Sequence, residues 1–311
     1  MTDDPSYSPE SKAGSRVPVS VGIMAYNEEV FIQSALEDVI NQQQNLVYVD
    51  EIIVIISGSI DATEDIARSM ALKDSRIRVI IEAERTGKIY SVIHFLKASR
   101  NGICVVSSAD VLAEVECFDN LAAPLINNPE VGMTGPRVVP RTILRRRTLA
   151  LRLHEELWEI HHELALTKPK LGELVMVRKK FVDHIPTVSG CDEVMLEAAV
   201  IGSGGTLSYA PKAIVHNFGA AKIGEYFRTR SRNHTMHLVT HRKLHYDAST
   251  LRLRTIIGPL VTYMVQWPRK FIYIVVLLAF EVAARSRARW SFYRGETKMT
   301  WEPTRSARVD S

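Results

Sequence analysis

Several features common in proteins are scarce in this sequence of 311 residues. Only three cysteines occur, Cys104, Cys117 and Cys191, and their spacing offers neither a disulfide framework nor a cysteine-based zinc site. This sparse usage is typical of a reducing compartment. Residues 1–16 are rich in Ser, Asp, Pro and Glu and contain no apolar segment, which predicts a disordered tail and excludes a secretory signal at this position.

The excess of basic over acidic residues is also small when the chain is taken as a whole. The 39 basic and 35 acidic residues leave a net charge of +4, which is too small to indicate nucleic acid as a partner. A mean hydropathy of −0.02 excludes a polytopic membrane protein. The near-neutral total hides a division, because residues 1–136 hold 10 basic and 20 acidic side chains whereas residues 137–311 hold 29 and 15.

Short apolar runs alternate with helical periods over the first hundred residues. Apolar residues recur at helical spacing after the first run, as Ile32, Leu36 and Val39 illustrate. Continuous apolar runs separated by helices are typical of a parallel sheet covered on both faces, so we expect an α/β fold with a mostly parallel sheet. The expected strands are 17–24, 51–56, 76–81 and 103–107, and the expected helices are 28–42, 61–71 and 89–99.

The second half has longer helical patterns and two strongly apolar stretches. We expect helices at 144–166, 192–201 and 223–243, and short strands at 174–177 and 206–209. The apolar stretches 256–267 and 271–284 are shorter than the roughly 18–20 residues of a spanning helix. They form either a pair of core helices or a helical hairpin at a membrane surface. We favour the membrane surface because basic and aromatic residues flank both stretches: Trp267, Arg269, Lys270, Arg285, Arg287, Arg289 and Trp290.

Polar segments follow each of the first four expected strands, at 25–29, 57–61, 84–88 and 107–110. Ligands of open parallel sheets bind beyond the carboxyl ends of the strands. Glu28 and Glu29 stand where a dinucleotide fold needs glycines beside a pyrophosphate, so a nicotinamide dehydrogenase is not expected. The remaining segments bring a cation, hydroxyl groups and an acid to one edge of the sheet.

From Val17 to His245 the chain resembles a family 2 glycosyltransferase of the Rossmann-like GT-A fold. The resemblance rests on the segment 25–29, on the run 51–54 leading into 58–63, and on Gly87-Lys88. Ser108-Ala109-Asp110 falls where that family carries D-x-D, Asp192-Glu193 falls at its E-D pair, and 228–232 falls at its Q-x-x-R-W element. The chain departs from the family pattern at Ser108 (for the first Asp), at Ile56-Ser57 (for an acid), at Thr229 (for Gln) and at Asn233 (for Trp).

The resemblance implies roles for individual residues. It makes Asp110 the ligand of Mg²⁺ or Mn²⁺, and either Glu193 or Asp192 the general base. Arg230 and Arg232 would contact the diphosphate, and Trp158 and His162 are expected on the acceptor side. The expected donor-binding residues are Ala25, Tyr26, Asn27, Glu28, Ser57, Ser59, Gly87, Lys88, Ser108, Ala109 and Asp110.

These features together predict an inverting, metal-dependent glycosyltransferase on the cytoplasmic face of the inner membrane, peripheral or monotopic. The donor would be a UDP- or GDP-sugar and the acceptor a lipid-linked or envelope glycan, with no role for nucleic acid and with homo-oligomerisation left open. The expected division is a tail (1–16), a GT-A domain (17–245, with a nucleotide and metal half at 17–136 and an acceptor half at 137–245) and membrane-associated helices with a basic tail (246–311). A nucleotidyltransferase and a glycosyltransferase-like scaffold without turnover remain as alternatives.

Overall fold

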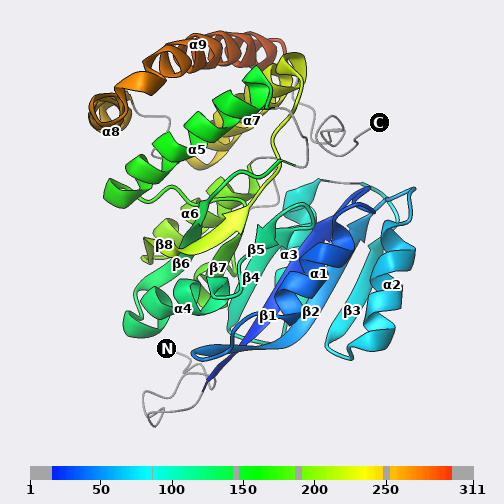
Figure 1. The fold of residues 1–311 in the computed structure, drawn as a ribbon. Helices are drawn as coiled ribbons and strands as arrows, with labels where there is room; N and C mark the ends of the chain where they lie inside the picture. Colours follow the sequence, from blue (N-terminus) through cyan, green and yellow to red (C-terminus); the bar gives the residue numbers. More distant parts are fainter. Residues whose placement is uncertain (1–15, 86, 143–146, 186–190, 248–252, 296–311) are drawn as a thin grey trace.

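The computed structural model places an eight-stranded sheet between layers of helices (Figure 1). It describes residues 16–85, 87–142, 147–185, 191–247 and 253–295. The strand order is β3-β2-β1-β4-β7-β6-β8-β5. An α/β architecture is therefore confirmed.

The first half follows the alternation expected from its apolar runs. Strands β1 (Val17–Ala25), β2 (Val47–Ser57), β3 (Ile77–Glu82) and β4 (Ile103–Ser108) pair in parallel, and α1 (Ile32–Ile40), α2 (Thr63–Lys73) and α3 (Lys88–Ala98) connect them. The helices pack closely on the sheet at Gly22, where an added Cβ would lie 2.5 Å from a ring carbon of Phe95. A glycine at this point of β1 lets α3 approach the strand.

The second half corrects the expectation of a mostly parallel sheet, because the sheet is mixed. Strand β7 (Val175–Arg178) runs antiparallel to both β4 and β6 (Val131–Val138), and the short β5 (Leu112–Ala113) runs antiparallel to β8 (Thr206–His216). Strands β6 and β8 are parallel to each other. An apolar run reveals that a strand is buried but not which way it runs, and β4 and β7 are far apart in sequence.

Four of the remaining helices, α5 (Leu149–Thr167), α7 (Ile223–Leu244), α8 (Leu253–Gln266) and α9 (Phe271–Tyr293), form a layer beyond β6 and β8 (Figure 1). Helix α4 (Cys117–Asn127) and α6 (Asp192–Gly202) cover the sheet, and a 3-10 turn (Lys179–Phe181) follows β7. Helices α5 and α7 support α8 and α9, which a 3-10 turn (Pro268–Lys270) joins. Among the described helices, none combines the length and apolar character required to cross a bilayer.

A separate apolar core holds this helical layer together. Leu153 and Ile160 of α5 pack with Tyr263 of α8 and with Ile274 and Leu277 of α9. The Tyr263 hydroxyl donates to Glu156 at 2.6 Å, and Lys270 pairs with the same carboxylate at 3.2 Å. The inner faces of α8 and α9 are therefore fixed to the body of the protein.

Candidate active site

The loops that follow β1 and β2 are joined by hydrogen bonds. The Asn27 amide donates to Ser59 Oγ at 3.0 Å, and the Ile60 amide donates to Asn27 Oδ1 at 2.9 Å. The Glu28 amide donates to Thr63 Oγ1 at 2.8 Å. Asn27 adopts a positive φ of 53°, a conformation that asparagine tolerates better than most residues. The structure therefore brings the predicted donor-binding residues Asn27, Glu28 and Ser59 to one surface.

The loop that follows β3 lies against the same surface. The Arg85 guanidinium stacks over the Tyr26 ring at 3.4 Å from its centroid. Ser57 Oγ donates to the Glu84 carbonyl at 3.4 Å. Gly87, with φ 119°, then turns the chain into α3 and places Lys88 at its first position. These contacts bring Tyr26, Ser57 and Gly87 to one sheet edge, as the sequence indicated.

Lys88 joins the two halves of the site. Its Nζ lies 2.7 Å from Asp192 Oδ2 and 3.1 Å from Glu193 Oε1, although these residues are more than 100 positions away in sequence. Asp192 and Glu193 open α6 just as Lys88 opens α3, so two helix N-termini converge on this ion pair. Sequence reasoning assigned the lysine and the acids to different tasks, and the structure places them in contact.

The protein environment shifts the pKa values of the two neighbouring carboxyl groups, Asp192 and Glu193, in opposite directions. Burial and the adjacent Glu193 charge raise the pKa of Asp192 to about 6. Lys88 and Lys170 outweigh burial at Glu193 and hold its pKa well below the usual range. Glu193 Oε2 also accepts a hydrogen bond from Cys191 Sγ at 3.4 Å. Near neutral pH the pair is a dicarboxylate bound by Lys88, in which the pKa of Asp192 is raised and that of Glu193 is lowered.

Glu173 is a further acid of this site, and the sequence assigned it no role. It lies in the loop before β7 with φ 65°, and Asn217 Nδ2 donates to its Oε1 at 3.0 Å. Asn217 Oδ1 in turn accepts from His154 Nε2 at 3.1 Å. Burial and the charges of Glu193 and Asp110 raise the pKa of Glu173 to about 7. No sequence pattern marks such a residue, because a non-glycine residue at positive φ is visible only in the fold.

Asp110 follows β4 at the carboxyl edge of the sheet. The preceding amide, that of Ala109, donates to the Met24 carbonyl at 3.0 Å, which ties this turn to the end of β1. The negative charge of Asp110 acts on both Glu173 and Arg232. Asp110 and Glu173 thus lie close enough for their charges to interact, and carboxylate oxygens suit a hard divalent cation. Asp110 can therefore supply one oxygen ligand to the expected Mg²⁺ or Mn²⁺.

Among the described residues, the ligand atoms that lie close enough together to hold a metal ion belong to a different segment, which is less suited to Mg²⁺ or Mn²⁺. The side chains of Cys191, Asp192 and Glu193 offer ligand atoms within 4.8 Å of one another. Lys88 already neutralises this set at 2.7 and 3.1 Å, so a cation there would have to displace an ammonium group. Asp110 remains the better candidate for a metal ligand.

The two arginines expected at the diphosphate separate in the structure. Arg230 does not join the site: its guanidinium donates to both carboxylate oxygens of Glu281 on α9, at 2.6 and 3.0 Å. His234 contacts the same carboxylate at 2.8 Å. Arg232 lies within the influence of Asp110, Cys191 and Arg85, and burial lowers its pKa to about 10. A diphosphate role is therefore carried forward for Arg232 alone.

The two residues expected on the acceptor side also differ in their surroundings. His162 Nδ1 lies 2.7 Å from the Tyr209 hydroxyl of β8. Trp158 packs edge-on against His161 and His154, with ring centroids 5.2 and 6.3 Å apart. Because His154 hydrogen-bonds the asparagine that holds Glu173, Trp158 is connected to the acidic cluster.

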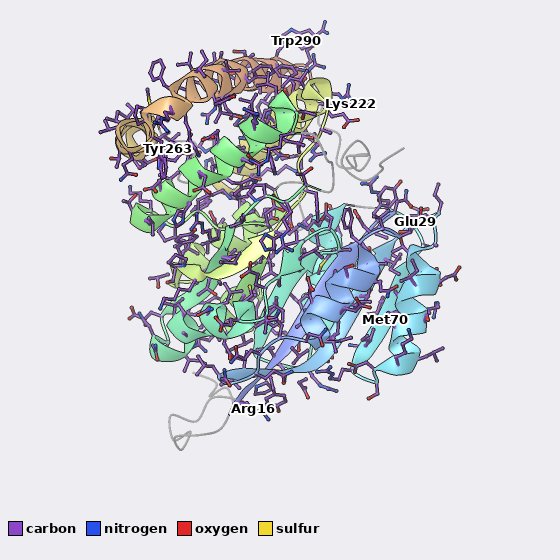
Figure 2. The ribbon with its side chains drawn as sticks, in the orientation of Figure 1. Arg16, Glu29, Met70, Lys222, Tyr263 and Trp290 are labelled. Carbon is purple, nitrogen blue, oxygen red and sulfur yellow. The ribbon has the colours of Figure 1, made fainter. Side chains whose placement is uncertain are left out.

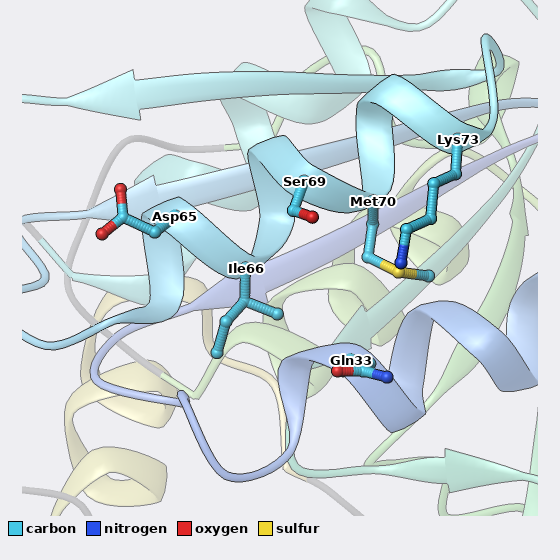
Figure 3. Close-up of a pocket in the computed structure, with 6 residues that line it drawn as sticks. All are labelled: Gln33, Asp65, Ile66, Ser69, Met70 and Lys73. Carbon is cyan, nitrogen blue, oxygen red and sulfur yellow. The ribbon is translucent and has the colours of Figure 1, made fainter.

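A hollow of about 240 Å³ between α1 and α2 lies apart from these residues (Figure 3). None of the predicted site residues lines it, and its walls are Gln33, Asp65, Ile66, Ser69, Met70 and Lys73. It lacks the converging charges of the cluster around Lys88, so we do not assign it a role in the chemistry.

The chain is similar in sequence to known glycosyltransferases. Residues 20–182, more than half of the chain, match the family model described as Glycosyl transferase family 2. Over 140 residues the chain is 26% identical to glycosyltransferase AglD of Haloferax volcanii. That match covers 44% of this chain and only 22% of the relative, so the chain spans about a fifth of that protein.

Solved structures share the fold. Mannosyltransferase PcManGT from Pyrobaculum calidifontis, in complex with GDP-Man and Mn²⁺, has a TM-score of 0.64 at 18% identity, covering 91% of this chain and 88% of its own. Glucosyl-3-phosphoglycerate synthase from Mycobacterium tuberculosis, with Mn²⁺, UDP-Glc and glycerol 3-phosphate, has a TM-score of 0.51 at 18% identity, covering 75% and 82%. The expected GT-A-like fold is thus confirmed.

Proposed function

Because the chain belongs to glycosyl transferase family 2, we propose that it transfers a sugar from a nucleoside-diphosphate donor to an acceptor hydroxyl, with inversion at the anomeric carbon. The observation that carries the proposal is the contact of Lys88 with Asp192 and Glu193, at 2.7 and 3.1 Å. This contact sets a cation and a dicarboxylate at the sheet edge where the donor loops converge.

The chemistry requires a proton acceptor and positive charge at the leaving group. The acceptor oxygen forms a bond to the anomeric carbon and gives its proton to the Asp192–Glu193 pair. The bond from the anomeric carbon to the diphosphate oxygen breaks, and the departing nucleoside diphosphate keeps the electron pair. Arg232 and Lys88 supply positive charge for that leaving group. A divalent cation held by Asp110 would add further neutralising charge when bound.

We propose that one member of the Asp192–Glu193 pair is the base. Asp192 has a pKa of about 6, in the range suited to general-base catalysis near neutral pH, whereas Glu193 stays ionised beside Lys88 and Lys170. Separate Asp192→Asn and Glu193→Gln variants would divide the roles. Substitution of the residue that takes the proton should lower kcat and leave the affinity for the donor almost unchanged.

For the donor and the acceptor we propose chemical classes and not individual compounds. We propose a UDP- or GDP-linked hexose as donor, with Mg²⁺ or Mn²⁺, in keeping with the GDP-Man and UDP-Glc complexes of the structural neighbours. A glycan or lipid-linked glycan of the cell envelope is the proposed acceptor, used on the cytoplasmic side of the membrane.

The deciding experiment measures which product each nucleotide sugar releases. UDP- and GDP-sugars are incubated with the protein and candidate acceptors, with and without Mn²⁺, and free nucleoside diphosphate is quantified. Asp110→Asn should lower metal-stimulated release by roughly a hundredfold or more, while Asp65→Asn on α2 should leave it unchanged. Release of pyrophosphate instead, or donor binding with no turnover across the panel, would contradict the proposal.

A further inference from the structure

The outward surface of α8 and α9 is unusually apolar. Of the 21 large hydrophobic side chains that are exposed among the described residues, eleven lie between positions 257 and 293. Val265, Ile272 and Val282 are 75%, 62% and 65% exposed. We call this set the outer face: Ile257, Val261, Val265, Trp267, Phe271, Ile272, Val275, Leu278, Val282, Trp290 and Tyr293.

The outer face differs in composition from the solvent-facing side of an ordinary surface helix. A helix that buries one stripe against a protein normally carries polar residues on the opposite side. In α9 the buried stripe is Ile274, Leu277, Ala284 and Ala288, yet Ile272, Val275 and Leu278 of the same helix are exposed. In α8 the exposed residues Ile257, Val261 and Val265 recur every four positions, which forms a continuous apolar row.

Basic and aromatic residues border this face. Arg269 and Lys270 occupy the turn between the helices, and the Lys270 ammonium lies 5.5 Å from the centre of the Trp267 ring. Arg287 and Arg289 are exposed in the last turns of α9. Trp290 lies at the far end of the helix, where Arg294 stacks over its ring at 4.3 Å (Figure 2). Positive charges and indole rings around an apolar surface are the composition that fits a lipid headgroup layer.

We propose that the outer face binds the surface of an anionic lipid bilayer, with α8 and α9 lying in the plane of the interface. A bilayer with anionic headgroups complements both parts of the surface: acyl chains cover the apolar rows, and phosphate groups meet the arginines. A second copy of the chain would bring the same arginines together around the contact, which like-charge repulsion disfavours.

The inner side of both helices stays attached to the protein during this binding. Glu281 of α9 is held by Arg230 and His234 of α7, and Tyr263 of α8 is held by Glu156 of α5. In Figure 1, α5 and α7 lie between α9 and the sheet. The bilayer would therefore meet a preformed surface, with no need to open the helical core.

Vesicle flotation with the full chain tests the proposal, and it does so independently of any transferase activity. Neutral phosphatidylcholine vesicles are compared with vesicles in which about a third of the lipid is phosphatidylglycerol. The triple variant Val265→Gln, Ile272→Gln, Val282→Gln should bind the anionic vesicles roughly a hundredfold more weakly. The triple variant Arg269→Gln, Arg287→Gln, Arg289→Gln should bind roughly tenfold more weakly, with most of the loss at low salt.

A matched control carries the same kind of change elsewhere. Ile60 and Leu72 are 90% and 91% exposed far from α8 and α9, and Ile60→Gln with Leu72→Gln should leave vesicle binding unchanged. Circular dichroism verifies that all variants melt as the parent does, since the substituted side chains face outward. Equal binding of parent and triple variants would overturn the proposal. So would a stable dimer in sedimentation that the apolar variant abolishes, because the face would then be covered by a second copy.

Discussion

Replacing Glu173 by Gln should make the protein more stable at alkaline pH. The folded protein keeps this carboxyl partly protonated near neutrality, because burial and the charges of Glu193 and Asp110 raise its pKa from 4.5 to about 7. The unfolded chain ionises the same group freely. Gln presents the same oxygen to Asn217, which donates to Glu173 Oε1 at 3.0 Å, but it carries no charge.

The sign follows from the two pKa values. A group whose pKa is raised on folding contributes stability that is fully present below its unfolded pKa and is lost as the pH rises through the folded pKa. For Glu173 this window runs from 4.5 to about 7. With 1.36 kcal/mol per unit of pKa, the variant should gain roughly 2–3 kcal/mol over the parent between about pH 5 and about pH 8.

Urea unfolding at both pH values measures this gain directly, as the difference in unfolding free energy between variant and parent. Glu116→Gln, at an exposed position, shows how much the exchange itself contributes. A difference that stays constant across the pH range would refute the reasoning, since a carboxyl group that titrates alike in both states cannot create a pH-dependent term.

Three further outcomes are expected. Lys88→Met should move the acidic limb of the pH–rate profile upward by roughly 1–3 units, because the acids lose their cation, whereas Lys88→Arg should leave the limb near its original position. Glu281→Gln should lower the free energy of unfolding by up to roughly 3–5 kcal/mol in urea unfolding, because the buried charge of Arg230 loses its counter-ion. The double variant Arg230→Met, Glu281→Leu removes both charges and should recover most of this loss. Gly22→Ala should cost roughly 1–3 kcal/mol in urea unfolding through overlap with Phe95, and Phe95→Leu in the same chain should relieve part of it.

The parts of the fold that the sequence predicted are those governed by local pattern. Strands β1 to β4 have continuous apolar runs, and α1 shows a regular apolar stripe, so their type and order followed directly. The meeting of the loops after β1, β2 and β4 followed as well, since the carboxyl ends of parallel strands meet at one edge. The direction of β7 did not, because a short apolar run carries no information about which strands will be its neighbours.

The parts of the candidate site that escaped prediction depend on long-range contact. Lys88 and Asp192 each suggested a separate role, and their ion pair at 2.7 Å exists only because α3 and α6 begin at the same place. Glu173 gained its raised pKa from neighbours that are remote in sequence. Electrostatic environments of this kind arise from the packing of elements, whereas motifs record only the spacing along one segment.

The different surroundings of Arg230 and Arg232 could have been predicted from the sequence. Residues two positions apart on an α-helix are rotated by about 200° and face opposite sides, so one helix cannot present both guanidinium groups to the same ligand. On α7 this rotation brings Arg232 within the influence of the charges of Cys191, Arg85 and Asp110, and it sets Arg230 against Glu281 of α9. A motif that contains both arginines therefore cannot bind one phosphate group with both of them when it lies on a helix. Helix α7 consequently links the charged candidate site on one side with the helix of the outer face on the other.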